Sequence, residues 1–278
     1  MKLTVLVDNN TSTGKCYFGE PGLSFYIEID NKKILFDTGY SDIFIQNAFK
    51  MNINLRNLDY LVFSHGHYDH TWGLVPLIRL YKEAIKENIP NKKPLVVTHP
   101  FTFLSKSRNE MGEIGSLISE EKLSRNFELK LSKKPLWITE KLVYLGEIPR
   151  NNNFENQASV GQVYLNENWI DDYIIEDSAL VYKSKQGLVI VTGCSHSGIC
   201  NIVEYAKQVC EDERIFDIIG GLHLVNPSDE QLSKTVEYIK ALNLHQLHAC
   251  HCTDLHSKIA LSQVTRLGEV SVGLKLEF

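Results

Sequence analysis

A run of seven residues, from Ser64 to His70, is rich in side chains that bind metals and reads Ser-His-Gly-His-Tyr-Asp-His. Histidine nitrogens and carboxylate oxygens are suitable ligands for zinc or iron. Seven residues cannot fold back far enough to place four donors on one ion without strain, so the run favours two neighbouring ions. His65 and His67 alternate along an extended segment and can reach one ion, while Asp69 and His70, one turn further on, can reach a second. The alternative is a polar loop with coincidental histidines, a risk that every short motif carries.

The ligand-rich run directly follows Leu58–Phe63, an apolar segment that predicts a buried strand. Three more histidines also follow apolar runs that predict strands: His196, His223 and His251. A structural zinc site normally gathers cysteines in short paired spacings, whereas these donors come from distant strands and are mostly histidines. The distribution is typical of a catalytic metal site.

Helical patterns separate the predicted strands. Apolar residues at spacings of three and four predict helices over Gly73–Lys86 and Gly198–Val209. Ser228 and Gln231 form a capping box ahead of another helical pattern, and Leu255–Arg266 predicts the final helix. Strands and helices therefore alternate, which is typical of an α/β fold.

The His-x-His-x-Asp-His string resembles the hallmark motif of the metallo-β-lactamase-fold hydrolase superfamily. Ile34–Gly39 is similar to the first motif of that superfamily, and Thr192–His196 and His251 stand at the places of its later ligand motifs. The resemblance implies an αββα sandwich of two mixed β-sheets flanked by helices. The length of 278 residues predicts one domain over residues 1–278, and the weak helix and strand pattern after Phe101 predicts a family-specific insertion around 101–170.

Four further segments are similar to a narrower subgroup, labelled dihydropterin ribofuranosyl-aminobenzene phosphate synthase-like: Gly146–Arg150, Gly193–Gly198, Gly220–Leu224 and Cys250–Thr253. This resemblance covers almost the whole chain. The label suggests a small-molecule substrate that is phosphorylated or contains a pterin.

The superfamily resemblance also implies a role for Asp37, which supports the metal site by orienting a ligating imidazole rather than by binding metal itself. A carboxylate in that position selects the tautomer of the ring. The alternative is an aspartate that caps the turn after the third predicted strand.

The sequence departs from the commonest superfamily pattern, which has a separate histidine before the Ser178–Val191 hairpin and an aspartate after it. No histidine lies between His99 and His196. The third and bridging ligands therefore stay open: His196 can replace the missing histidine, Cys194 stands where a bridging ligand usually falls, and Asp177 can approach from the hairpin. We favour His196, because imidazole serves zinc or iron without imposing a thiolate site.

These residues predict a dinuclear metallohydrolase with two divalent ions, zinc as the first choice and iron or manganese as alternatives. A hydroxide held between two metals, where the pKa of water falls towards about 7, would attack a phosphorus or carbonyl carbon. Asp69 would orient this nucleophile and His223 would protonate the leaving group. A phosphoester is the favoured substrate because two metals can clamp both the attacking and the leaving oxygen.

Two of the assigned roles have named alternatives. His223 can instead be a ligand, a substrate contact or a histidine of the core. The planar guanidinium of Arg150 suits a phosphate or carboxylate of the substrate, and its alternative is a solvated loop arginine.

Three other functions compete with the hydrolase. A synthase or transferase would join a pterin to an aminobenzene ribose phosphate. A di-iron redox enzyme would use similar ligands, but the sequence has no appended segment of flavodoxin size. A non-catalytic ligand sensor would keep the pocket and lack turnover.

Composition limits the classes of partner and the cellular compartment that we expect. With a net charge of -5 and a pI near 6.1, the chain lacks the excess of positive charge that is typical of proteins that bind nucleic acid. The apolar run at Met1–Asp8 is too short for a signal peptide and no segment is long enough for a membrane helix, so we expect a cytoplasmic protein without a membrane partner. Six thinly spread cysteines make a disulfide framework unexpected. No pattern indicates an oligomeric state.

Overall fold

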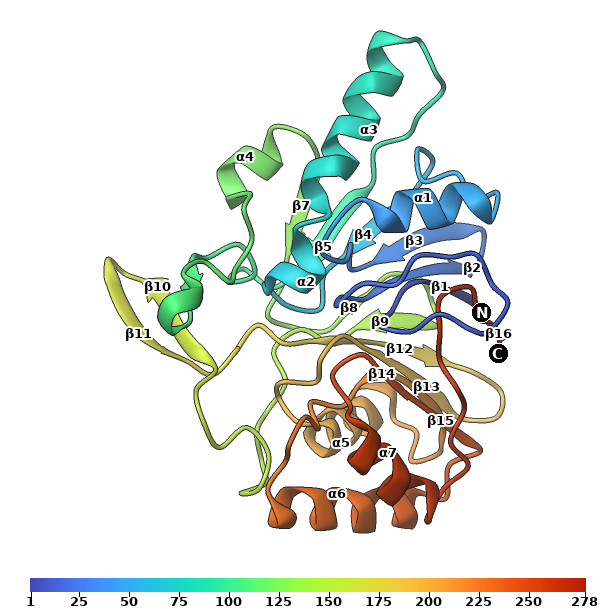
Figure 1. Cartoon of the computed structure of the whole chain (residues 1–278), viewed down its shortest axis with the longest axis vertical. Helices are drawn as coiled ribbons and strands as arrows, with labels where there is room; N and C mark the ends of the chain where they lie inside the picture. Colours follow the sequence, from blue (N-terminus) through green and yellow to red (C-terminus); the bar gives the residue numbers. More distant parts are fainter. The chain divides into compact units, whose positions relative to one another are not determined.

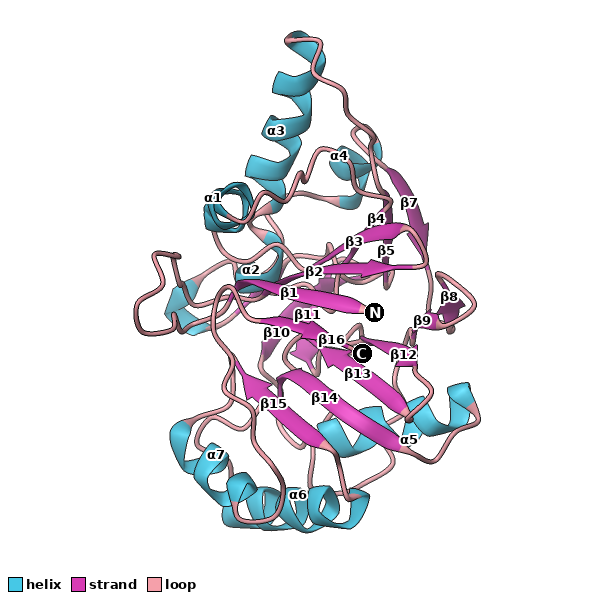
Figure 2. Ribbon diagram, turned by 90° about the vertical axis from the view of Figure 1, so that its right-hand side faces the viewer, coloured by secondary structure: helices cyan, strands magenta, loops and turns pink.

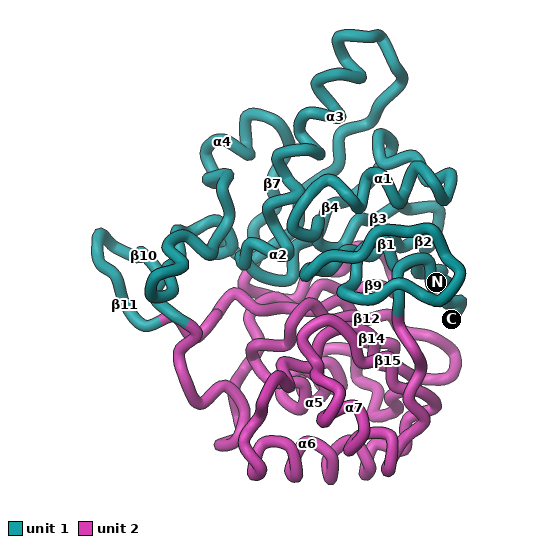
Figure 3. The backbone as a smooth tube through the Cα atoms, in the orientation of Figure 1, with its two compact units in different colours: residues 1–132, 161–171, 271–278 teal, residues 133–160, 172–270 magenta.

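The computed structural model describes residues 1–278, which form two compact units (Figure 3). Unit 1 comprises residues 1–132, 161–171 and 271–278, and unit 2 comprises residues 133–160 and 172–270. The prediction of a single domain with an insertion around 101–170 stays a prediction.

Unit 1 contains a seven-stranded mixed sheet (Figure 1). In spatial order its strands are β16 (Lys275–Glu277), β1 (Lys2–Val7), β2 (Ser24–Ile29), β3 (Lys32–Phe36), β4 (Tyr60–Val62), β5 (Leu95–Thr98) and β7 (Glu128–Leu131). The strands from β16 to β3 pair antiparallel, and those from β3 to β7 pair parallel. Parallel neighbours need crossover connections, and helices supply them.

The crossover helices of unit 1 are α1 (Ile43–Lys50), α3 (Leu74–Lys86) and α4 (Glu120–Ser124). Their apolar residues share one buried core with residues of the sheet, including Phe44 of α1, Leu77 of α3 and Leu35 of β3. The short helix α2 (Tyr68–Thr71) lies between β4 and α3. A small second sheet has the order β11 (Asn168–Asp172), β10 (Gly161–Leu165) and β6 (Lys106–Ser107), and a 3₁₀ turn covers Asn109–Met111.

Unit 2 contains a six-stranded mixed sheet (Figure 2). In spatial order its strands are β15 (Gln246–Cys250), β14 (Ile215–Gly221), β13 (Leu188–Thr192), β12 (Ala179–Lys183), β9 (Leu142–Tyr144) and β8 (Leu136–Trp137). Helices α5 (Ile199–Cys210), α6 (Asp229–Leu242) and α7 (Leu255–Ser262) bury apolar residues in one core with these strands. The hydroxyl oxygen of Ser228 accepts from the Gln231 N–H, so the predicted cap of α6 is confirmed.

The prediction of an α/β fold with two mixed sheets and helices is confirmed. Two details differ from expectation. The final helix was predicted over Leu255–Arg266, but α7 ends at Ser262, where β-branched Val264 and Thr265 follow and favour helix less than straight side chains do. No sequence pattern indicated the hairpin of β10 and β11, whose residues are mostly exposed.

The candidate ligands stand at the carboxyl ends of parallel strands, where α/β folds place their sites. In unit 1, Asp37 follows β3 and the ligand-rich run follows β4. In unit 2, His196, His223 and His251 follow β13, β14 and β15 respectively. No helix in the structure is long and apolar enough to cross a membrane.

Candidate metal centre

The ligand-rich run of unit 1 is buried although it consists mainly of polar residues. His65 and His70 are fully buried and His67 is 7% exposed. The run is extended as far as His67 and then turns into α2, which carries Asp69 and His70. A side chain at Gly66 would place its Cβ 2.3 Å from the carbonyl oxygen of Thr102. Only glycine therefore allows the backbone to lie this close to Thr102.

The carboxylate of Asp37 holds this run at three points. Its Oδ1 accepts from the Ser64 N–H at 2.8 Å, and its Oδ2 accepts from the Ser64 hydroxyl at 2.7 Å. The same Oδ2 lies 2.7 Å from Nδ1 of His70. Asp37 is fully buried, so these groups replace the water that a carboxylate would otherwise bind.

These contacts select the tautomers of two histidines. An ionised carboxylate only accepts, so His70 carries its proton on Nδ1 and presents an unprotonated Nε2. The Ser64 hydroxyl donates to Asp37 and therefore accepts from Nδ1 of His65, which lies 2.9 Å from its oxygen. His65 likewise presents an unprotonated Nε2, the form that binds a metal.

The donor spacing in unit 1 fits a metal ion. Nε2 of His65 lies 3.1 Å from Nδ1 of His67. Two nitrogens that each bind a tetrahedral zinc at about 2.0–2.1 Å would be about 3.4 Å apart, close to this separation. Oδ2 of Asp69 lies 3.8 Å from Nε2 of His70, which makes a second pair of converging donors. The buried imidazoles and the carboxylate are therefore a chemically suitable donor set for divalent metals.

A first prediction concerns the hydroxyl of Ser64. In Ser64→Ala the backbone N–H still reaches Asp37, but the link to the ring of His65 is lost. We expect zinc affinity to fall by about tenfold, because partners that orient a ligand typically contribute that much. Competition with a chromogenic chelator measures the change, and Ser233→Ala, at an exposed position of α6, is the control. Equal affinity in Ser64→Ala and the wild type would contradict the orienting role.

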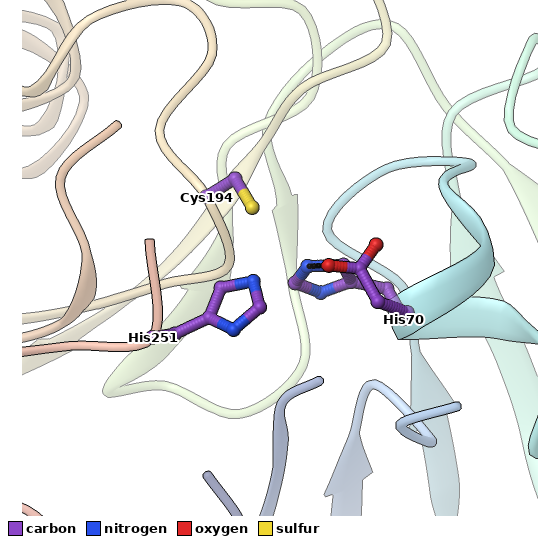
Figure 4. A group of neighbouring side chains, drawn as sticks. His70, Cys194 and His251 are labelled. Atoms are coloured by element: carbon purple, nitrogen blue, oxygen red, sulfur yellow. Dashed lines mark ion pairs between the residues drawn. The ribbon is translucent and has the colours of Figure 1, made fainter. Parts of the chain in front are cut away.

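Unit 2 brings together a second set of candidate donors. Sγ of Cys194 lies within 4.8 Å of a ring nitrogen of His251 and of one of His196. Figure 4 shows that Cys194 and His251 come from separate loops of unit 2, and it draws His70 on its helix of unit 1. Cys194 and His196 are buried, while His251 is partly exposed. The choice between Cys194 and His196 as third or bridging ligand stays open.

Asp177 positions the loop that carries His196. Its Oδ2 accepts from the N–H of Ser197 at 2.8 Å and from the Ser197 hydroxyl at 2.6 Å, while Oδ1 has no hydrogen-bond partner. Burial raises the pKa of the Asp177 carboxyl to about 6, although the bonds from Ser197 and the charge of Arg150 act in the opposite direction. A role for Asp177 as a direct ligand stays a prediction.

His223 lies beside His196, with ring centroids 4.2 Å apart, and is hydrogen-bonded to Cys252. Burial lowers the pKa of His223, but the bond to Cys252 and the charges of Cys252 and Asp177 outweigh burial and raise that pKa. Burial conversely raises the pKa of Cys252, but bonds with Cys194 and His223 bring that pKa well below its usual value. The pKa of His223 is therefore raised and that of Cys252 lowered by the contact between them.

The guanidinium of Arg150 donates to the carbonyl oxygens of Ile148, Tyr173 and Ile174. These bonds hold two loops of unit 2 together. The predicted contact of Arg150 with substrate is untested and stays a prediction.

Sequence reasoning missed two contributors, the hydroxyl of Ser64 and the pairing of Cys252 with His223. It also missed a backbone feature of the ligand turns. Non-glycine residues adopt positive φ in these turns: Asp37 (58°), Ser195 (63°), His223 (50°) and His251 (50°). Such conformations are uncommon and cluster at functional sites, and Asp and His tolerate them better than most residues.

Comparison with known proteins finds a family model and a solved structure that are similar to this chain. The model of the metallo-β-lactamase superfamily matches residues 17–148. A solved structure, Tm1679, described as a metal-dependent hydrolase of the β-lactamase superfamily, is 28% identical with a TM-score of 0.82, and the match covers 100% of this chain and 99% of that one.

Two proteins of Methanocaldococcus jannaschii are also similar. MJ0448 is 34% identical over 98% of each chain. A 7,8-dihydropterin-6-methyl-4-(β-D-ribofuranosyl)-aminobenzene-5'-phosphate synthase is 28% identical over 91% of this chain and 87% of its own. The match to the superfamily model, the relatives that cover almost the whole chain and the two mixed sheets show that the chain belongs to the metallo-β-lactamase superfamily.

Proposed function

We propose that this protein is a metal-dependent hydrolase that uses two divalent ions to cleave a phosphoester of a small molecule. The proposal rests on one observation. The buried side chains of Asp37 and Ser64 bind Nδ1 of His70 and of His65, so both rings present an unprotonated Nε2. An imidazole with an unprotonated Nε2 is the form that binds a metal ion. The similarity to Tm1679, described as a metal-dependent hydrolase, supports the same reaction class.

In this proposal, His65 and His67 hold one ion, and Asp69 and His70 hold the other. His196 and His251, with Cys194 as the alternative or bridging donor, complete the ligand set. Two divalent ions, with zinc as the first choice, would supply Lewis acidity, lower the pKa of water towards about 7 and neutralise charge on the attacking and leaving oxygens.

The protein's own groups have two further tasks. The carboxylate of Asp69, on the first turn of α2, orients the attacking water and accepts its proton. The raised pKa of His223 keeps a proton available on its imidazole for the leaving group. Both tasks are those of general acid–base catalysis.

A panel of small esters tests the proposal. Phosphomonoesters, phosphodiesters, thioesters and lactones are incubated with zinc-, manganese- and iron-loaded protein, and a chelated sample provides the control. We expect metal-dependent turnover to be highest with a phosphoester. Turnover confined to thioesters or lactones would overturn the phosphoester assignment, and no turnover with any metal would overturn the hydrolase.

The similarity to the pterin-linked phosphate synthase favours one second candidate, a synthase or transferase. Such an enzyme would form product only when the pterin and the aminobenzene ribose phosphate are both present. Incubating the metal-loaded protein with each compound alone and with both together separates this activity from hydrolysis.

A further inference from the structure

A pocket of about 410 Å³ lies in unit 1 beside the ligand-rich run. Its lining is mainly aromatic and apolar, and includes Tyr40, Tyr68, Trp72, Met111 and Ile114. The volume falls in the range of small-molecule sites, about 300–1,000 Å³. The pocket therefore has room for a ring system but not for a folded macromolecular segment.

Three aromatic side chains form one cluster in this pocket. The rings of Tyr40 and Trp72 stack with centroids 5.2 Å apart, and Tyr68 meets Tyr40 edge to face at 5.7 Å. Tyr40 nevertheless keeps 42% of its surface exposed. Exposed stacked rings provide a surface onto which a further flat ring can stack.

Backbone contacts hold the cluster rigid without a ligand. Nε1 of Trp72 donates to the carbonyl oxygen of Gly115 at 2.8 Å, and the N–H of Tyr68 donates to the carbonyl oxygen of Ile114 at 2.9 Å. Oε1 of Glu20 accepts from the N–H of Tyr40 at 2.9 Å. A site that is already ordered loses little conformational entropy when a ligand binds.

Glu113 adds one charged group to the lining. Its Oε1 accepts from the N–H groups of Lys106 and Gly115, both at 2.8 Å, so both of these bonds use the same carboxylate oxygen. A carboxylate held by one oxygen can accept N–H groups of a ligand with the other. The pocket thus combines a stacking surface with an acceptor for N–H donors.

We infer that this pocket binds a flat, N–H-bearing heteroaromatic ring of the substrate. The assignment to the substrate rests on the proposed function and follows from chain connectivity. Tyr68 precedes Asp69 on α2, and consecutive Cα atoms are about 3.8 Å apart. A ring stacked at Tyr68 would therefore be held at the residue next to a proposed metal ligand.

Pterin, a flat bicyclic ring with several N–H groups, is the probe for the test. Its binding to zinc-loaded protein is measured by calorimetry for the wild type, Tyr40→Ala and Tyr164→Ala. Tyr164 is the matched control because it is also 42% exposed and also contacts a tryptophan, Trp169, outside the pocket. We expect the Kd to rise about tenfold or more in Tyr40→Ala, as loss of a stacking ring does, and to stay within about twofold in Tyr164→Ala.

Glu113→Gln tests the acceptor separately. Glutamine keeps a carbonyl oxygen for the two N–H groups of the protein and removes the negative charge, so the loop should stay folded. We expect pterin to bind about tenfold more weakly, because hydrogen bonds to charged acceptors are the stronger ones. An unchanged Kd in both Tyr40→Ala and Glu113→Gln, or equal losses in Tyr40→Ala and Tyr164→Ala, would overturn the inference.

Glycerol phosphate has no ring, so its hydrolysis tests the proposed function independently of the ring site. Turnover of glycerol phosphate without Tyr40-dependent pterin binding would overturn the ring site and leave the hydrolase in place. Tyr40-dependent pterin binding without turnover of any phosphoester would support the ring site and overturn the phosphoester assignment.

Discussion

Replacing Asp69 by asparagine is expected to reduce turnover by about a hundredfold to ten-thousandfold while metal at the His65 and His67 site changes little. Asparagine keeps an oxygen donor but removes the negative charge that helps to hold the second ion and that accepts a proton from water. The main-chain oxygen of Asp69, which accepts from the N–H of Leu23, is unaffected. Steady-state kinetics and elemental analysis on the same zinc-loaded sample measure both effects.

His67→Ala is the contrasting variant, because alanine supplies no donor at all. We expect it to lower metal content as well as activity. If the wild type does not cleave phosphodiesters, the same pair of variants is compared with thioesters, lactones and the pterin substrate. An Asp69→Asn protein with near-wild-type turnover would rule out the role assigned to that carboxylate.

Asp37→Asn should weaken metal binding by about a hundredfold, at the upper end of effects of groups that orient ligands. One carboxylate oxygen becomes an NH₂ group. If it replaces Oδ2, it faces Nδ1 of His70, which must then give up its proton and carry one on Nε2. If it replaces Oδ1, it meets the N–H of Ser64. Asparagine tolerates the positive φ of this position, so the backbone turn should survive.

Asp217→Asn is the matched control for Asp37→Asn. Asp217 is also buried and its Oδ1 lies 2.9 Å from Nδ1 of His248, but neither residue is a candidate ligand. We expect Asp217→Asn to lower the melting temperature without changing zinc affinity, which chelator competition measures. Equal loss of affinity in the two variants would mean that Asp37 acts only through general stability.

Much of the fold follows from local patterns that the sequence shows directly. The 3.6-residue period over Gly73–Lys86 predicted α3, and the capping box at Ser228 predicted the start of α6. The buried strand before the ligand-rich run was predicted because Leu58–Phe63 is apolar except at Asp59. These signals act over one element and need no knowledge of the tertiary structure.

Other features depend on contacts that are distant in sequence. The hydroxyl of Ser64 acquires its role only because Asp37, 27 positions away, meets it. Cys252 pairs with His223 only because β14 and β15 are adjacent and parallel. The hairpin of β10 and β11 exposes most of its residues, so it lacks the alternation that marks a strand with one buried face.

The most direct test of the account is the metal content of the reconstituted protein. Zinc-loaded wild type is dialysed against metal-free buffer, and zinc per chain is determined by elemental analysis, with His67→Ala treated in parallel. We expect about two ions per chain in the wild type and clearly fewer in His67→Ala. Less than about half an ion per chain in the wild type would contradict it.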